Sequence, residues 1–143
     1  MKPDAVVVKV LDQPLPSDEG QRRQFLWDSF ANKPEEKQFA SYKTDNWQER
    51  FAVFGNQMMQ KARSQGLDEA SLQVALDRML EHAFGAAIAL LPVGAYQTTL
   101  DGVPVWIVVA KWEYPGFADK LTHVRIFAFD QKTMNLLGLA TCT

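Results

Sequence analysis

The sequence has few of the residues that disulfides and metal sites require. Its 143 residues include one cysteine, Cys142, and two histidines, His82 and His123. A single cysteine cannot form an intramolecular disulfide, and these three residues cannot supply the four ligands of a structural zinc site. The neighbours Glu81 and His82 would point about 100° apart on a helix, which disfavours a shared metal. We therefore expect no metal and a reducing, cytoplasmic location.

Glycine-rich and catalytic motifs are also missing. The eight glycines are scattered and form neither a GxGxxG nor a GxxxxGK[ST] phosphate-binding loop. The GxSxG turn of serine hydrolases does not occur either. We therefore expect no nucleotide cofactor, and indeed no cofactor of any kind.

The chain lacks a strong charge of one sign and a long apolar run. Its formal net charge of −2 does not suit a nucleic acid or an anionic membrane surface. The longest uncharged run, residues 83–100, is broken by Gly85, Pro92 and Gly94, whereas a membrane helix needs about 20 continuous apolar residues. Met1 is not followed by a secretory leader pattern. These features predict a soluble protein with no nucleic-acid or membrane partner.

Length and composition fit one globular domain, residues 1–143. The chain is 47% hydrophobic and 22% charged, as in ordinary folded proteins. Near its start, residues 5–11 are rich in valine and are followed by Pro14 and Pro16, which predicts an edge strand or arm within residues 1–16. One hypothesis is that this arm adds a strand to the sheet of a partner.

Three helices are expected before the last third of the chain, at residues 18–31, 45–66 and 68–91. Apolar side chains recur at helical spacing in each of them. The third helix is the longest, and its end, residues 84–91, is apolar on all sides, so we expect it to be enclosed and to stop at Pro92. The stripes that define the core faces are Phe25, Leu26 and Phe30; Trp47, Phe51, Phe54 and Met58; and Leu72, Leu76, Met79 and Leu80.

Residues 95–142 read as a four-stranded antiparallel meander. Asp101-Gly102 strongly favours a two-residue hairpin turn, which pairs Leu100 with Val103 and, further along, Tyr96 with Ile107. The expected fold is therefore α+β, with N-terminal helices packed on a C-terminal sheet. For the last hairpin, a turn at residues 131–134 would place Arg125 opposite Ala140, Gly138 beside Phe127 and His123 opposite Cys142.

One face of this sheet carries a cation and an imidazole among aromatic rings. Such a face can hold an anionic, partly aromatic ligand, or it can form an interface with a protein partner or a second copy of the chain. A half-solvated sheet face without function would have the same composition. The loop at 114–120 either covers this face as a lid or packs against it. The candidate residues are Trp106, Trp112, Tyr114, His123, Arg125 and Phe127.

The sequence thus favours a small binding or interaction protein without catalytic activity. Its sheet face would form a homodimer, contact a protein partner or bind a small anionic ligand. The alternative is a small-molecule enzyme in which Arg125 binds an anion and His123 acts as general base. Cys142 beside His123 would add a nucleophile, but no residue that orients the imidazole can be named. The acidic residues near strand ends, Glu113, Asp119 and Asp130, are candidates for acid–base chemistry, although turn and solvation roles also fit them.

Overall fold

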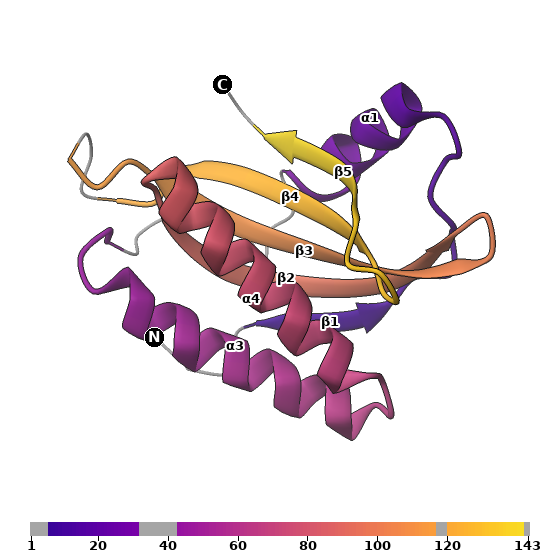
Figure 1. Ribbon diagram of the computed structural model, residues 1–143, viewed down its shortest axis with the longest axis horizontal. Helices are drawn as coiled ribbons and strands as arrows, with labels where there is room; N and C mark the ends of the chain where they lie inside the picture. The colour runs from indigo at the N-terminus through magenta and orange to yellow at the C-terminus, as the bar shows by residue number, and fades with distance from the viewer. Residues whose placement is uncertain (1–5, 32–42, 117–119, 142–143) are drawn as a thin grey trace.

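The structure is a computed structural model that describes residues 6–31, 43–116 and 120–141. It is an α+β fold in which one five-stranded sheet is packed against helices (Figure 1). The strand order is β1-β2-β3-β4-β5, antiparallel except that β1 runs parallel to β2. The elements are β1 (Val7–Val10), α1 (Glu19–Phe30), α3 (Trp47–Ser64), α4 (Glu69–Ala86), β2 (Ala89–Leu100), β3 (Val103–Glu113), β4 (His123–Asp130) and β5 (Leu136–Thr141).

The hairpin between β2 and β3 has the predicted turn and register. Asp101 and Gly102 both have positive φ angles, 50° and 83°, as a type I′ turn requires. Leu100 pairs with Val103, and the predicted pairing continues along both strands. Local turn chemistry was therefore sufficient to set the pairing of the two longest strands.

The N-terminal segment is a strand of the protein's own sheet. Val7 lies beside Gly94 in a parallel ladder. The carbonyls of Val6 and Val8 accept hydrogen bonds from the side chains of Lys61 on α3 and of Gln65, the residue after α3. The predicted N-terminal edge strand is confirmed, and the hypothesis that it adds to the sheet of a partner stays a prediction.

The helix expected at 68–91 is shorter than predicted and has the same length as α3. Asp68 caps α4 by accepting a hydrogen bond from the Ser71 amide, and the helix ends where Ala87 adopts a φ of 55°. Both α3 and α4 have 18 residues. The apolar run after Phe84 leaves the helix and enters β2 at Ala89, and Phe84 itself is 57% exposed instead of enclosed. A short apolar run does not distinguish a buried helix from a buried strand.

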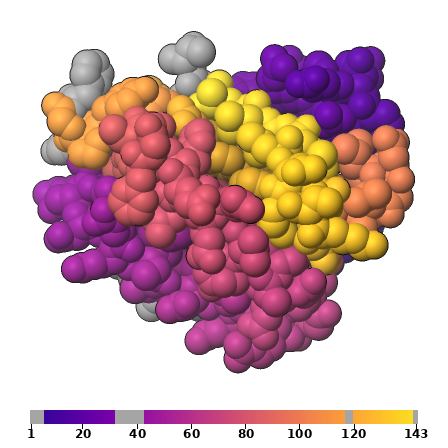
Figure 2. All heavy atoms as spheres, in the orientation of Figure 1, coloured from indigo at the N-terminus to yellow at the C-terminus, as the bar shows by residue number. Residues whose placement is uncertain are grey.

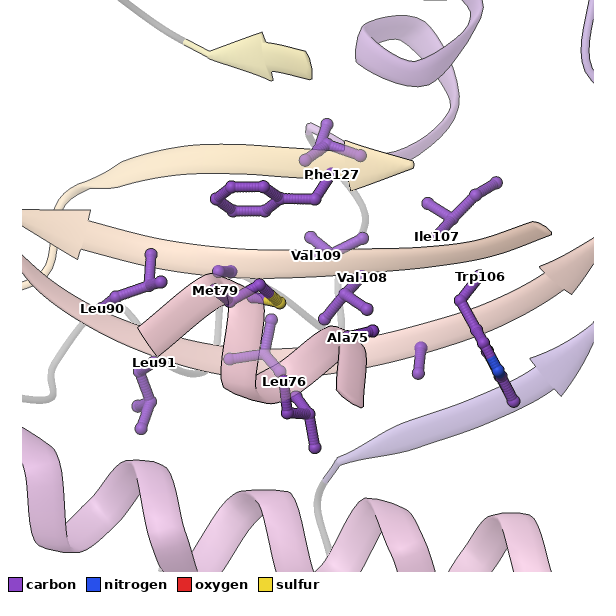
Figure 3. Packing of buried hydrophobic residues seen from close by; sticks show 14 of the residues in the cluster. Ala75, Leu76, Met79, Leu90, Leu91, Trp106, Ile107, Val108, Val109 and Phe127 are labelled. Carbon is purple, nitrogen blue, oxygen red and sulfur yellow. The ribbon is translucent and has the colours of Figure 1, made fainter. Parts of the chain in front are cut away.

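The two sheet faces are covered by different helices. On one face, α1 packs Leu26 against the backbone of Gly138, while Phe30 contacts the ring of Tyr96 at a centroid distance of 4.6 Å. On the other face, α4 covers Trp106, whose Nε1 donates a 2.8 Å hydrogen bond to Ser71 Oγ. Figure 3 shows this second layer, with core side chains between α4 and the strands.

The aromatic sheet face is therefore largely closed, whereas the sequence left open whether it is covered. Trp106 is fully buried, and Phe127 is only 1% exposed. Alternation along the strand had indicated correctly that these residues share a face. It could not show that α4 crosses that face.

The last hairpin differs from the predicted register by one residue. Phe129 pairs with Leu136, as the assumed turn requires, but a bulge follows and Ala128 pairs with Gly138. Beyond the bulge Arg125 therefore lies opposite Thr141 instead of Ala140.

None of the helices in the described part of the chain is long and apolar enough to cross a membrane.

Candidate ligand site between α4 and the last hairpin

A groove of about 490 Å³ lies where α4 and the β4–β5 hairpin meet. Figure 2 shows these two segments side by side on the surface. The rings of Phe127 and Phe129, stacked at a centroid distance of 5.9 Å, form the floor. Leu136, which is 50% exposed, provides an apolar wall. The remaining lining residues are Arg78, Glu81, His82, Thr133, Met134 and Asn135.

The wall on the hairpin side is held by its turn. The carboxylate of Asp130 accepts hydrogen bonds from the amides of Lys132 and Thr133, at 2.8 and 3.1 Å. These hydrogen bonds, from Thr133 first, lower the pKa of Asp130 below its usual range. Met134 has a φ of 60°, which directs the chain back toward β5. Asp130 thus has the turn role that the sequence offered as the alternative to acid–base chemistry.

Arg125 connects the groove to the aromatic cluster at the end of the sheet. Its Nη1 lies 2.8 Å from His82 Nε2, and its Nε donates to Thr141 Oγ1. Its guanidinium carbon lies 4.2 Å from the centroid of the Trp112 ring. A guanidinium only donates, so His82 Nε2 is the acceptor and the neutral imidazole carries its proton on Nδ1. Arg125 therefore positions His82 at the groove.

Burial, followed by the charge of Arg125, lowers the pKa of His82 below its ordinary value. The unfolded chain therefore binds a proton at this residue more readily than the folded protein does. We expect the contribution of His82 to the free energy of unfolding to be constant above about pH 7.5 and to fall as the pH drops through the ordinary histidine pKa of about 6.5.

His82→Gln should remove the His82 part of this slope, because glutamine keeps an acceptor for Arg125 but does not titrate. Urea unfolding at several pH values measures the slope for both proteins. Equal slopes in the wild type and the variant would show that His82 does not contribute.

His123 has an orienting partner that the sequence did not reveal. Its Nε2 lies 3.2 Å from Oε1 of Glu113, a carboxylate that is only 2% exposed. The same oxygen accepts a 2.8 Å hydrogen bond from Thr122 Oγ1, and Oε2 accepts one from the Tyr114 amide. The ring of His123 lies 4.7 Å from that of Trp112. Glu113 can therefore fix both the position and the tautomer of the imidazole.

Four of the predicted site residues form one cluster at this end of the sheet. Trp112 contacts Tyr114, His123 and Arg125, with a ring distance of 5.3 Å to Tyr114. The buried Trp112 Nε1 has no hydrogen-bond partner in the described part of the chain. Of the other two candidates, Phe127 lies in the groove floor, and Trp106 is part of the core.

The predictions that involve Cys142 and Asp119 lie outside the described residues, as does part of the loop at 114–120. The sequence analysis missed His82 as part of the site, as well as Met134 and Leu136 on the hairpin. His82 had been considered only with Glu81, since nothing in the sequence shows which turn of α4 lies above β4.

A second groove, of about 320 Å³, lies between α3 and α4. Its walls include Phe51, Leu76, Leu80 and Phe84, and its one ionisable lining residue is Asp77. A carboxylate as the one ionisable group that lines a groove disfavours an anion. The groove beside His82 and Arg78 is therefore the better match for the anionic ligand expected from the sequence.

The described residues contain no group of three or more histidine, cysteine or acidic side chains that could hold a metal ion. In comparisons with protein-family models, curated proteins and solved structures, nothing matches this chain. The function must therefore be argued from the site itself.

Proposed function

We propose that this protein is a small binding protein without catalytic activity, and that its ligand is a small anion with an aromatic or apolar body. The observation that carries the proposal is the groove between α4 and the β4–β5 hairpin, which combines an apolar floor and wall with Arg78 and His82. Its volume falls within the usual range for small-molecule sites, roughly 300–1,000 Å³. This favours a small ligand over a protein partner or a second copy as the occupant.

The polar groups at the groove can recognise an anion. Arg78 pairs with Glu81 at 3.6 Å, but both side chains are more than half exposed, and such pairs contribute only about 0–1 kcal/mol. A ligand carboxylate or sulfonate can therefore compete with Glu81 for Arg78. Neutral His82 adds an Nδ1–H donor, while Leu136 and the phenylalanine floor contact the apolar body.

The test is a fluorescence titration with 8-anilinonaphthalene-1-sulfonate, an anionic aromatic probe. Leu136→Asp removes apolar area from the groove and adds a repelling charge, so we expect binding about tenfold weaker or more, which corresponds to about 1.4 kcal/mol. The matched control is Val10→Asp, because Val10 has similar exposure, 55%, but lies on β1. Equal weakening by both variants, or by neither, would contradict the proposed site.

An enzyme remains the second candidate because of one observation, the 3.2 Å contact between His123 and buried Glu113. A carboxylate that orients an imidazole is the arrangement of general-base catalysis. In this alternative His123 would accept a proton from the substrate or from water. The test is hydrolysis of 4-nitrophenyl acetate by the wild type, His123→Ala and Glu113→Gln. Rates that do not differ among the three would exclude His123 as a base for acyl transfer.

A further inference from the structure

Both outer edges of the sheet have carbonyl groups that accept hydrogen bonds from side chains. At the edge formed by β1, the carbonyls of Val6 and Val8 accept hydrogen bonds from the side chains of Lys61 and Gln65, at the end of α3. On β5, at the other end of the strand order, the Leu137 carbonyl accepts a 2.7 Å hydrogen bond from Arg22 Nε. No strand of the described chain pairs with the outer side of β5.

The backbone pattern shows which groups of β5 face outward. The amide of Asp130 donates to the carbonyl of Asn135, which fixes the alternation at the start of the hairpin. The bulge at Leu137 adds one residue, and the backbone of Gly138 then faces β4. The N–H and C=O of Leu139 consequently point away from β4. They are a donor and an acceptor in the geometry that another strand requires.

Helix α1 lies next to β5 (Figures 1 and 2), and the cavities between them form a cleft. One cavity, of about 420 Å³, is lined by Glu19 and Arg23 of α1 and by most of β5. A second, of about 270 Å³, is lined by Arg23, Trp27 and further residues of α1 together with the end of β5. Arg23 and Thr141 line both cavities, so the cleft continues along the strand.

We propose that this cleft binds an extended segment of another polypeptide, which adds to the sheet as a sixth strand beside β5. An exposed edge flanked by a helix is the geometry of peptide recognition by strand addition. The main chain of the segment would pair with Leu139, and alternate side chains would face α1. This inference does not depend on the groove between α4 and the hairpin.

The position of α1 selects a single segment over a second copy of the chain. Neighbouring strands lie about 4.8 Å apart. If two copies paired β5 with β5 about a twofold axis, their α1 helices would lie on the same face above adjacent strands. Packed helices need about 8–10 Å between their axes. A lone strand meets no such obstacle.

The helix wall also indicates which side chains the segment carries. Arg23 and Trp27 lie one helical turn apart, and both line the second cavity together with the end of β5. The side chain of Arg23 is 61% exposed, and its partner Glu19 is 4.0 Å away. The fitting segment therefore presents an acidic residue to Arg23 and an apolar residue to Trp27.

The probe is an end-capped, fluorescein-labelled peptide in which valine and threonine alternate, except that a glutamate and a leucine occupy two positions on the same face. A matched peptide carries N-methyl groups on the amides of alternate residues, which removes the edge-facing donors but keeps every side chain. A second matched peptide carries the N-methyl groups on the amides of the remaining residues. We expect one of the two methylated peptides to bind at least about tenfold more weakly than the parent.

Two further readouts locate the peptide on the protein. Bound peptide should slow amide hydrogen exchange at Leu139, and Arg23→Glu should weaken binding about fivefold, while the control Lys132→Glu leaves it unchanged. Any of three results would overturn the proposal: no saturable binding of the parent peptide, equal binding of all three peptides, or protection confined to β1. A dimer held by β5, seen by sedimentation and broken by Leu139→Lys, would also overturn it.

Discussion

Trp106→Ala is expected to lower the free energy of unfolding by about 3–5 kcal/mol. Trp106 is fully buried between α4 and the sheet, so truncation leaves a cavity that the layer cannot fill. It also leaves the hydroxyl of Ser71 without the indole donor. Chemical denaturation followed by circular dichroism measures the loss.

A second substitution separates the two parts of this effect. Ser71→Ala keeps the indole in place but removes its acceptor, and we expect a loss of about 1–2 kcal/mol. A loss below about 1.5 kcal/mol for Trp106→Ala would mean that α4 is not packed on this face as described.

Gly138→Val is the second large effect, expected at about 2–3 kcal/mol or more. A Cβ at position 138 would lie 3.0 Å from Leu26 Cδ1 and 3.7 Å from the Cβ of Ala128. Because Leu26 is fully buried, it cannot turn away into solvent, and α1 must shift from β5. Unfolding curves and the fluorescence of Trp27 on α1 would report the loss of stability and the shift.

The control is Gly85→Ala on α4, where a Cβ would meet nothing within 4 Å. There the alanine should raise the free energy of unfolding by about 0.5–1 kcal/mol, because it restricts the unfolded chain. Gly138→Val tolerated without loss would show that α1 does not approach β5 closely.

The parts of the fold that the sequence predicted are those determined by local chemistry. Asp101-Gly102 specifies its own turn, and the apolar character of both sides of β3 matches its burial on both faces of the sheet. The predictions from the sequence failed where contacts between distant elements determine where a helix ends or which residues of two strands pair. The left-handed Ala87 ends α4 before an apolar run that continues as strand, and the bulge at Leu137 shifts the register of β5.

The candidate site was predicted in part for the same reason. Arg125 and His123 were identified because a cation and an imidazole stand out on an apolar strand. Their partners His82 and Glu113 come from α4 and from the end of β3, and only the tertiary packing brings them within 2.8 and 3.2 Å. Periodicity reports which face a residue occupies, not which element covers that face.

The most direct test of the proposed function is to map the bound anionic probe by NMR. Titration of the ¹⁵N-labelled protein with 8-anilinonaphthalene-1-sulfonate should shift the amides of Met134 and Leu136 and the ring signals of His82 most strongly. The apolar groove between α3 and α4 provides the contrast, since Phe51 and Phe84 line it beside Asp77. Saturable shifts confined to the α4–hairpin groove would support a binding protein for small anions. Shifts centred on α3, or none at all, would contradict it.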